Sequence, residues 1–66
     1  MTPEYVKKRI EHIESIKGDD ESAHSEEDKL HQDVLWAIAN ECCDAPVQCA
    51  LLALQTKSIE FERWFA

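Results

Sequence analysis

The residue types best suited to chemistry lie between positions 18 and 33, in the stretch GDDESAHSEEDKLHQD. This stretch holds seven carboxylates and two histidines against a single lysine. It contains two acid-x-x-His pairs, Glu21 with His24 and Asp28 with His31. On a helix, this spacing brings a carboxylate oxygen and an imidazole nitrogen to one face, where together they could bind a divalent cation or transfer a proton near neutral pH.

A helix would gather most of these groups into one stripe, because residues three, four and seven apart share a face. The stripe comprises Asp20, His24, Glu27, Asp28 and His31. It predicts either i,i+4 ion pairs on a solvated helix or a metal site formed by His24, Glu27, Asp28 and His31. Di-metal bundles take Glu-x-x-His from two different helices, and these histidines are about 10 Å apart along one axis. The ion-pair interpretation is therefore preferred, no cofactor is expected, and a divalent metal is the alternative.

The acids Asp19, Asp20 and Glu21 have a simpler explanation. Either aspartate can cap a helix, and all three charges would lie at the positive end of its dipole. The other acids allow a third hypothesis, in which the helix mimics nucleic acid and binds a basic protein with a steep salt dependence. Catalysis is disfavoured, because no serine or cysteine has a spacing that places a nucleophile beside a base.

Length and charge limit the classes of function. A chain of 66 residues with net charge −7 forms one thin domain, and most of its charge lies in residues 18–33. Such a patch can attract a basic protein surface, whereas direct nucleic-acid binding needs clustered Lys and Arg. We find no apolar run long enough to cross a membrane and no signal-peptide pattern, which predicts a cytoplasmic protein without membrane partners.

The odd number of cysteines indicates reduced thiols rather than a disulfide framework. Cys42 and Cys43 are adjacent, and Cys49 follows six residues later. Without a CxxC spacing, two thiolates cannot easily converge on one zinc ion. We therefore expect buried, inert thiols.

The pattern predicts an all-α fold, a single domain over residues 1–66. We expect a small bundle of three to four helices, at about 3–17, 20–41, 45–55 and 58–65. Thr2 before Pro3 is typical of a capped helix start. Gly18 is predicted to end the first helix in the left-handed conformation, and Asp44 to cap the third.

Apolar residues at helical spacing predict the buried faces. These are Val6, Ile10 and Ile13 in the first helix, Ala23, Leu30, Val34, Leu35 and Ile38 in the second, and Val47, Ala50, Leu51 and Leu54 in the third. Trp36 and Leu52 fall outside these faces and suggest a second apolar surface. At the C-terminal end, Arg63 and Trp64 are residue types common at interfaces, although a core position for Trp64 is preferred.

The motifs GDDESAHSEEDKL, DVLWAIA and ALQTKSIEFERWFA resemble those of short uncharacterised proteins of bacteriophages and prophages. In these proteins a similar GDDExAHxxEDxL is followed by DVLxAIA and FxRWxA. The resemblance extends over nearly all of the chain from about Val6. It implies a phage accessory protein in the cytoplasm of a bacterial host and brings no known activity. We therefore expect a protein that binds a protein partner or a second copy of itself, with dimerisation an option for so small a core.

Overall fold

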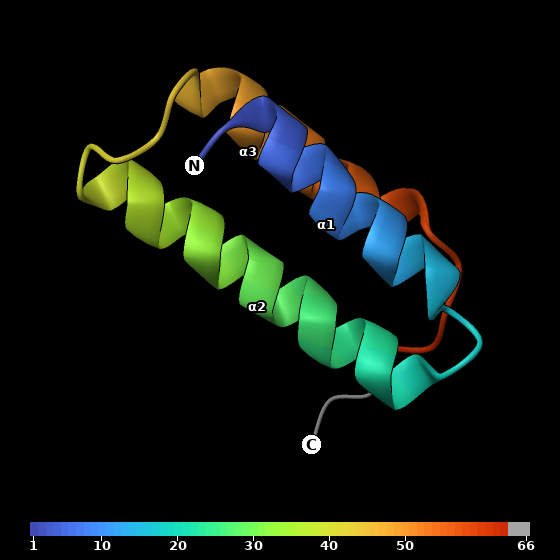
Figure 1. Ribbon diagram of the computed structural model, residues 1–66. Helices are drawn as coiled ribbons and strands as arrows, with labels where there is room; N and C mark the ends of the chain where they lie inside the picture. Colours follow the sequence, from blue (N-terminus) through green and yellow to red (C-terminus); the bar gives the residue numbers. More distant parts are fainter. Residues whose placement is uncertain (64–66) are drawn as a thin grey trace.

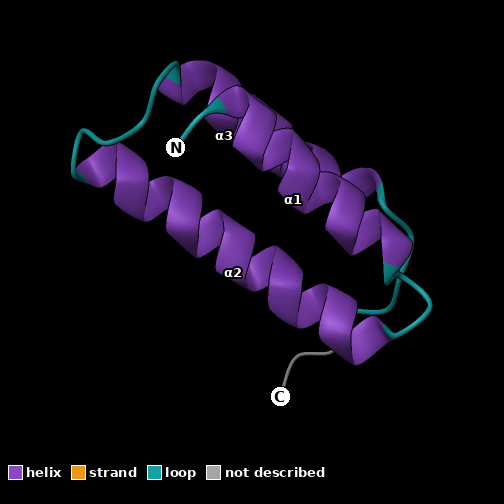
Figure 2. Cartoon of the chain, in the orientation of Figure 1, coloured by secondary structure: helices purple, strands orange, loops and turns teal. Residues whose placement is uncertain are grey.

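In the computed structural model, which describes residues 1–63, the chain folds into three helices and one short 3₁₀ helix. These are α1 (Pro3–Ser15), α2 (Asp20–Ala39), α3 (Pro46–Leu54) and η1 (Gln55–Ser58). Helices α1 and α3 run side by side and antiparallel to α2, and each helix contacts the other two (Figure 1). In Figure 2 the described part of the chain consists of helices and connecting loops. The prediction of a small all-α bundle is confirmed. None of the helices in residues 1–63 has the length and hydropathy needed to span a membrane.

Two of the predicted helix starts are confirmed. The Tyr5 amide donates to Thr2 Oγ1 over 3.1 Å at the start of α1, and the Ser22 amide donates to Asp19 Oδ1 over 3.2 Å at the start of α2. Each bond satisfies a backbone donor that the first helical turn leaves unpaired. The hydrogen bonds from Ser22 also hold the pKa of Asp19 below its usual value.

Two predictions about helix termini are wrong, one about the residue that ends α1 and one about the residue that caps the start of α3. Gly18 has no positive φ; among residues 1–63 the left-handed residues are Glu41 and Ala45. Helix α1 ends with a tight turn, in which the Lys17 amide donates to Glu14 O, so no left-handed residue is needed there. Helix α3 is preceded by Ala45 and not capped by Asp44, and no side chain caps its first amides.

Helix α2 ends in a Schellman motif with Glu41 in the position that glycine usually occupies. The Cys42 amide donates to Ala37 O over 2.8 Å and the Glu41 amide to Ile38 O over 3.1 Å, with Glu41 at φ 56°. A side chain costs about 1 kcal/mol in this conformation.

We therefore expect Glu41→Gly to raise the free energy of unfolding by about 0.5–1 kcal/mol. Urea denaturation measures this change. Glu41→Ala is the control, because it removes the charge but keeps the Cβ atom. A glycine variant no more stable than the alanine variant would show that the left-handed backbone is not the cause.

The core lies along one seam of α2, against narrow faces of α1 and α3. Its buried apolar residues are Val6, Ile13, Ala23, Leu30, Val34, Ala37, Cys49, Ala53 and Ile59. The predicted faces of α1 and most of α2 are confirmed, but Leu35 is 68% exposed. The predicted face of α3 is wrong, because Cys49 and Ala53 point inward while Val47, Leu51 and Leu54 face outward. These small inward residues allow α3 to approach the other helices closely.

The predicted fourth helix is also wrong over residues 59–63. After η1 the backbone extends at Ile59, with φ −77° and ψ 128°. The chain then returns along α2, where the Glu62 amide donates to Asp20 Oδ1 over 3.1 Å. Ile59 is buried and Phe61 packs against the core, so these apolar side chains cover the bundle without forming a helix. Trp64 lies outside the described residues.

Candidate functional site

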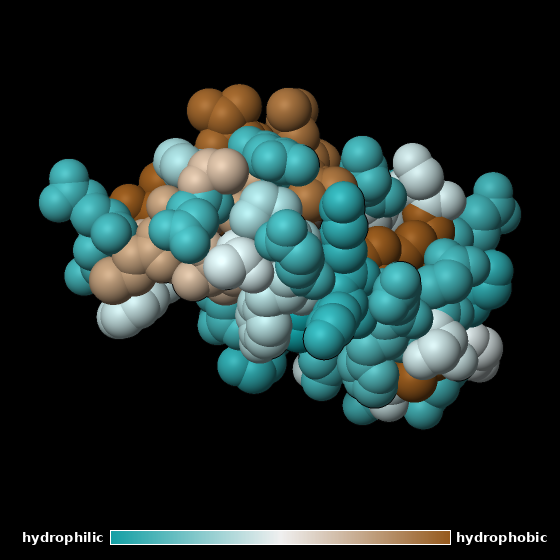
Figure 3. All heavy atoms as spheres, turned by 45° about the horizontal axis from the view of Figure 1, so that its top comes forward, coloured by the Kyte–Doolittle hydropathy of each residue, from teal (hydrophilic) through white to brown (hydrophobic). Residues whose placement is uncertain are grey.

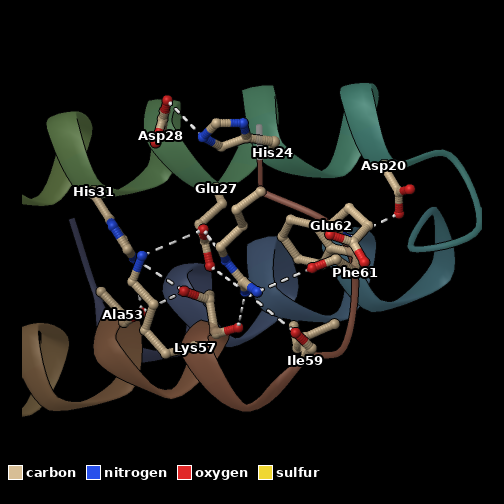
Figure 4. Close-up of polar contacts among 12 residues, drawn as sticks. Asp20, His24, Glu27, Asp28, His31, Ala53, Lys57, Ile59, Phe61 and Glu62 are labelled. Carbon is tan, nitrogen blue, oxygen red and sulfur yellow. Dashed lines mark hydrogen bonds and ion pairs between the residues drawn. The ribbon is translucent and has the colours of Figure 1, made fainter. Parts of the chain in front are cut away.

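The structure divides the predicted stripe of α2 into two sides. His24 and Asp28 lie on the outward side, with 3.4 Å between Nε2 and Oδ2 (Figure 4). Glu27 and His31 point the other way, toward the end of α3 and toward residues 55–63, which we call the C-terminal segment. The four side chains predicted as metal ligands therefore do not converge. Within residues 1–63 no three His, Cys, Asp or Glu side chains form a group suited to a metal ion.

Glu27 is the centre of the inward side. Its carboxylate is 1% exposed and accepts two hydrogen bonds from Arg63, each 2.9 Å long, from Nε and Nη2. Lys57 Nζ lies 3.6 Å from the same carboxylate. A paired guanidinium is what allows a carboxylate to stay ionised in so dry a position.

These contacts determine the charge of Glu27. Burial alone would raise the pKa of this carboxyl group. The hydrogen bonds from Arg63 and the charges of Arg63 and Lys57 outweigh burial and lower the pKa to about 2. Glu27 is therefore ionised near neutral pH and is matched by cations of the same chain.

Arg63 also forms hydrogen bonds within the C-terminal segment. Its guanidinium donates to the carbonyl oxygens of Thr56, Ile59 and Phe61 over 2.9, 3.2 and 3.3 Å. The guanidinium carbon lies 3.9 Å from the centre of the Phe61 ring. Arg63 was predicted as an interface residue, but its donors serve this internal cluster and its side chain is only 19% exposed.

His31 connects α2 to the end of α3. Its Nε2 lies 3.0 Å from Ala53 O and 3.0 Å from Thr56 Oγ1. A carbonyl oxygen only accepts, and the Thr56 hydroxyl donates to the same Ala53 oxygen. This arrangement places a proton on His31 Nε2, where two oxygen atoms of the same chain accept it.

The acids Asp19, Asp20 and Glu21 lie at the start of α2 as predicted, and Asp20 has in addition a tertiary contact that was not predicted. Asp19 caps the helix and Asp20 holds the Glu62 amide. Glu21 is exposed in the first turn, where the helix dipole favours its charge.

Comparison with known proteins found no matching family model, curated protein or solved structure. The functional proposal therefore depends on the surface of the chain itself.

An apolar hollow of that surface lies between α2 and α3. Its walls are His31, Val34, Leu35, Ala50, Ala53 and Leu54. Leu35 and Leu54 are 68% and 62% exposed, so both rims of the hollow are large aliphatic side chains in contact with water. We call this hollow, together with Val47 and Leu51, the α2–α3 groove.

The outer face of α3 extends the groove. Val47, Leu51 and Leu54 follow at i, i+4 and i+7, and the first two are 73% and 60% exposed. No charged residue occurs in Pro46–Leu54. In Figure 3, brown apolar side chains gather at the upper edge of a largely hydrophilic surface.

Sequence reasoning missed this groove because it assigned Leu35, Val47, Leu51 and Leu54 to the core. One signal was available, since residues 46–54 are apolar apart from Gln48. A three-helix bundle can bury only one face of such a helix, so the other face must remain exposed or be covered by a partner.

The predicted apolar surface of Trp36 and Leu52 is divided by the fold. Trp36 is 63% exposed and, with Tyr5, lines a second hollow on the α1 side of α2. Leu52 is partly buried and packs against the core. The assignment of Leu52 to an exposed surface is wrong, because α3 is rotated relative to its predicted orientation.

Proposed function

We propose that this protein acts by binding another protein, and that the α2–α3 groove is its binding surface. The observation that supports this most strongly is the contiguous set of exposed aliphatic side chains: Leu35, Val47, Leu51 and Leu54. Soluble monomers seldom leave such a patch uncovered, and apolar grooves of this kind accept the apolar face of an amphipathic helix.

A second copy of the chain is the first partner to test. The protein carries a net charge of −7, most of it in residues 18–33, so two copies repel each other where these acidic segments approach. The outer face of α3 has no charge, and there two copies can pack apolar side chains with the least repulsion. The resemblance noted above supports a phage accessory role, exercised in the cytoplasm of a bacterial host.

Leu54→Glu is expected to abolish self-association while leaving the monomer folded. Sedimentation or native mass spectrometry at micromolar concentration should show a dimer for the wild type and a monomer for the variant. The free energy of unfolding of the monomer should change by less than about 0.5 kcal/mol, since Leu54 is exposed.

Trp36→Ala is the matched control, because Trp36 is a large exposed side chain on the opposite flank of α2. It should leave the dimer intact. If Trp36→Ala dissociates the dimer and Leu54→Glu does not, the binding surface is the α1 side of α2. A wild type that stays monomeric argues against self-association, and binding to host proteins should then be compared between wild type and Leu54→Glu.

A further inference from the structure

The connection between α2 and α3 brings two of the three thiols together. Cys43 Sγ and Cys49 Sγ both donate to the carbonyl oxygen of Asp44, over 3.6 and 3.4 Å. Burial, followed by contact with the neighbouring Cys43 thiol, raises the pKa of Cys49 to about 11. The two sulfur atoms are thus neighbours in the folded protein.

Cys42 is adjacent in the chain but is arranged differently. Its thiol donates to Asn40 O over 3.3 Å, toward the end of α2, and its side chain is exposed. Cys49 is fully buried and Cys43 is partly exposed. An oxidant from solvent can therefore reach Cys43. The oxidised Cys43 then lies beside Cys49, with which it can form a disulfide.

We infer that Cys43 and Cys49 form a reversible thiol–disulfide pair, with glutathione disulfide or a similar small disulfide as the oxidant. The Cys43 thiolate attacks one sulfur of the oxidant, and the first glutathione leaves as a thiolate that takes up a proton. Cys49 then loses its proton and attacks Cys43 Sγ, which releases the second glutathione. In total the protein loses two hydrogen atoms and glutathione disulfide becomes two glutathione molecules.

The disulfide would close a ring that contains Ala45 and the first turn of α3. Ala45 has φ 53° and precedes a helix start that no side chain caps. A covalent link across this segment restricts the unfolded chain more than the folded one. Oxidation is therefore expected to raise the melting temperature and glutathione to lower it again. The inference does not depend on the proposed binding function.

Two variants test the pair, each with two thiols at nearly equal separation. Cys42→Ser keeps Cys43 and Cys49, and Cys43→Ser keeps Cys42 and Cys49. Each folded variant is incubated with glutathione disulfide, and the reaction is stopped with acid. The remaining thiols are then alkylated and the mass of the intact protein is measured. Cys42→Ser should lose the mass of two hydrogen atoms and take up no alkylating agent. Cys43→Ser should carry glutathione, with internal disulfide lower by roughly tenfold or more.

The same experiment in guanidinium chloride shows whether folding causes the difference. The unfolded variants should form the internal disulfide to similar extents, because rings of nearly equal length have nearly equal closure entropy. The inference would be overturned if the two folded variants formed equal amounts of internal disulfide. Glutathione that stays attached to Cys42→Ser would overturn it as well. Should Cys43→Ser fail to fold, fragment mapping of the oxidised wild type decides: a Cys43–Cys49 link supports the pair, and any other link overturns it.

Discussion

Arg63→Ala is expected to lower the free energy of unfolding by about 2–3 kcal/mol, because it leaves a buried carboxylate without its main partner. Both oxygens of Glu27 accept from this guanidinium over 2.9 Å, and Glu27 is 1% exposed. The expected loss is at the lower end for a broken buried pair, since Lys57 remains 3.6 Å away. Urea denaturation at neutral pH measures it.

Two further variants distinguish the buried pair from ordinary surface electrostatics. Lys57→Ala removes an ammonium group whose side chain is 58% exposed, and it should cost no more than about 0.5 kcal/mol. Glu27→Leu combined with Arg63→Ala should recover much of the loss, because no unpaired charge is then buried. If Arg63→Ala lowers the free energy of unfolding no more than Lys57→Ala does, the Glu27–Arg63 pair does not hold the C-terminal segment in place.

The same pair predicts the pH dependence of stability. The pKa of Glu27 is about 2 in the folded protein against an ordinary value of 4.5. Because the folded value is the lower one, the contribution is complete above pH 4.5 and is lost as the pH falls toward 2. The difference corresponds to about 3 kcal/mol. The stability of Glu27→Gln should therefore fall less steeply than that of the wild type between pH 4.5 and 2.

Leu30→Ala is expected to cost about 2–5 kcal/mol, which is enough to unfold much of a domain this small. Leu30 is fully buried and lies in the seam of α2 between Ala23 and Val34. Removing its side chain leaves a cavity that the surrounding helices can fill only in part. Thermal and urea unfolding followed by circular dichroism would show the loss.

Leu35→Ala is the matched control, because it makes the same change five residues further along the same helix. Leu35 is 68% exposed, and its replacement should alter the stability of the monomer by less than about 0.5 kcal/mol. Both leucines were predicted to be buried. Equal effects of the two variants would mean that α2 presents a different face to the core.

The local features of the fold followed from local residues. Thr2 with Pro3, and Asp19 with the acids after it, correctly predicted two helix starts, because a cap needs only a side chain and an amide two or three residues away. The apolar spacing of α1 also predicted its buried face. The predictions for Gly18 and Asp44 were wrong, because α1 ends in a tight turn without a left-handed residue and α3 begins after Ala45 without a side-chain cap. The backbone at both termini depends on the path of the adjoining loop.

Glu27 shows what a closer reading of the spacing could have found. It lies four residues after Ala23 and three before Leu30, so it shares the core seam with them. A carboxylate in that register indicates a buried group that needs a cation. The identity of the cation was not predictable, because Arg63 is 36 residues away and meets Glu27 only when the C-terminal segment returns along α2.

The sequence by itself determined the three α-helices, two of their caps and the inward face of α1, because these depend on hydrogen bonds and spacing within a few residues. The tertiary structure alone decided which face of α3 is buried, where Arg63 binds and that Cys43 lies beside Cys49. A helix with a single polar side chain, as in α3, has no clearly preferred face of its own. Its orientation is decided by the packing of Cys49 and Ala53 against the other helices, which leaves Val47, Leu51 and Leu54 exposed.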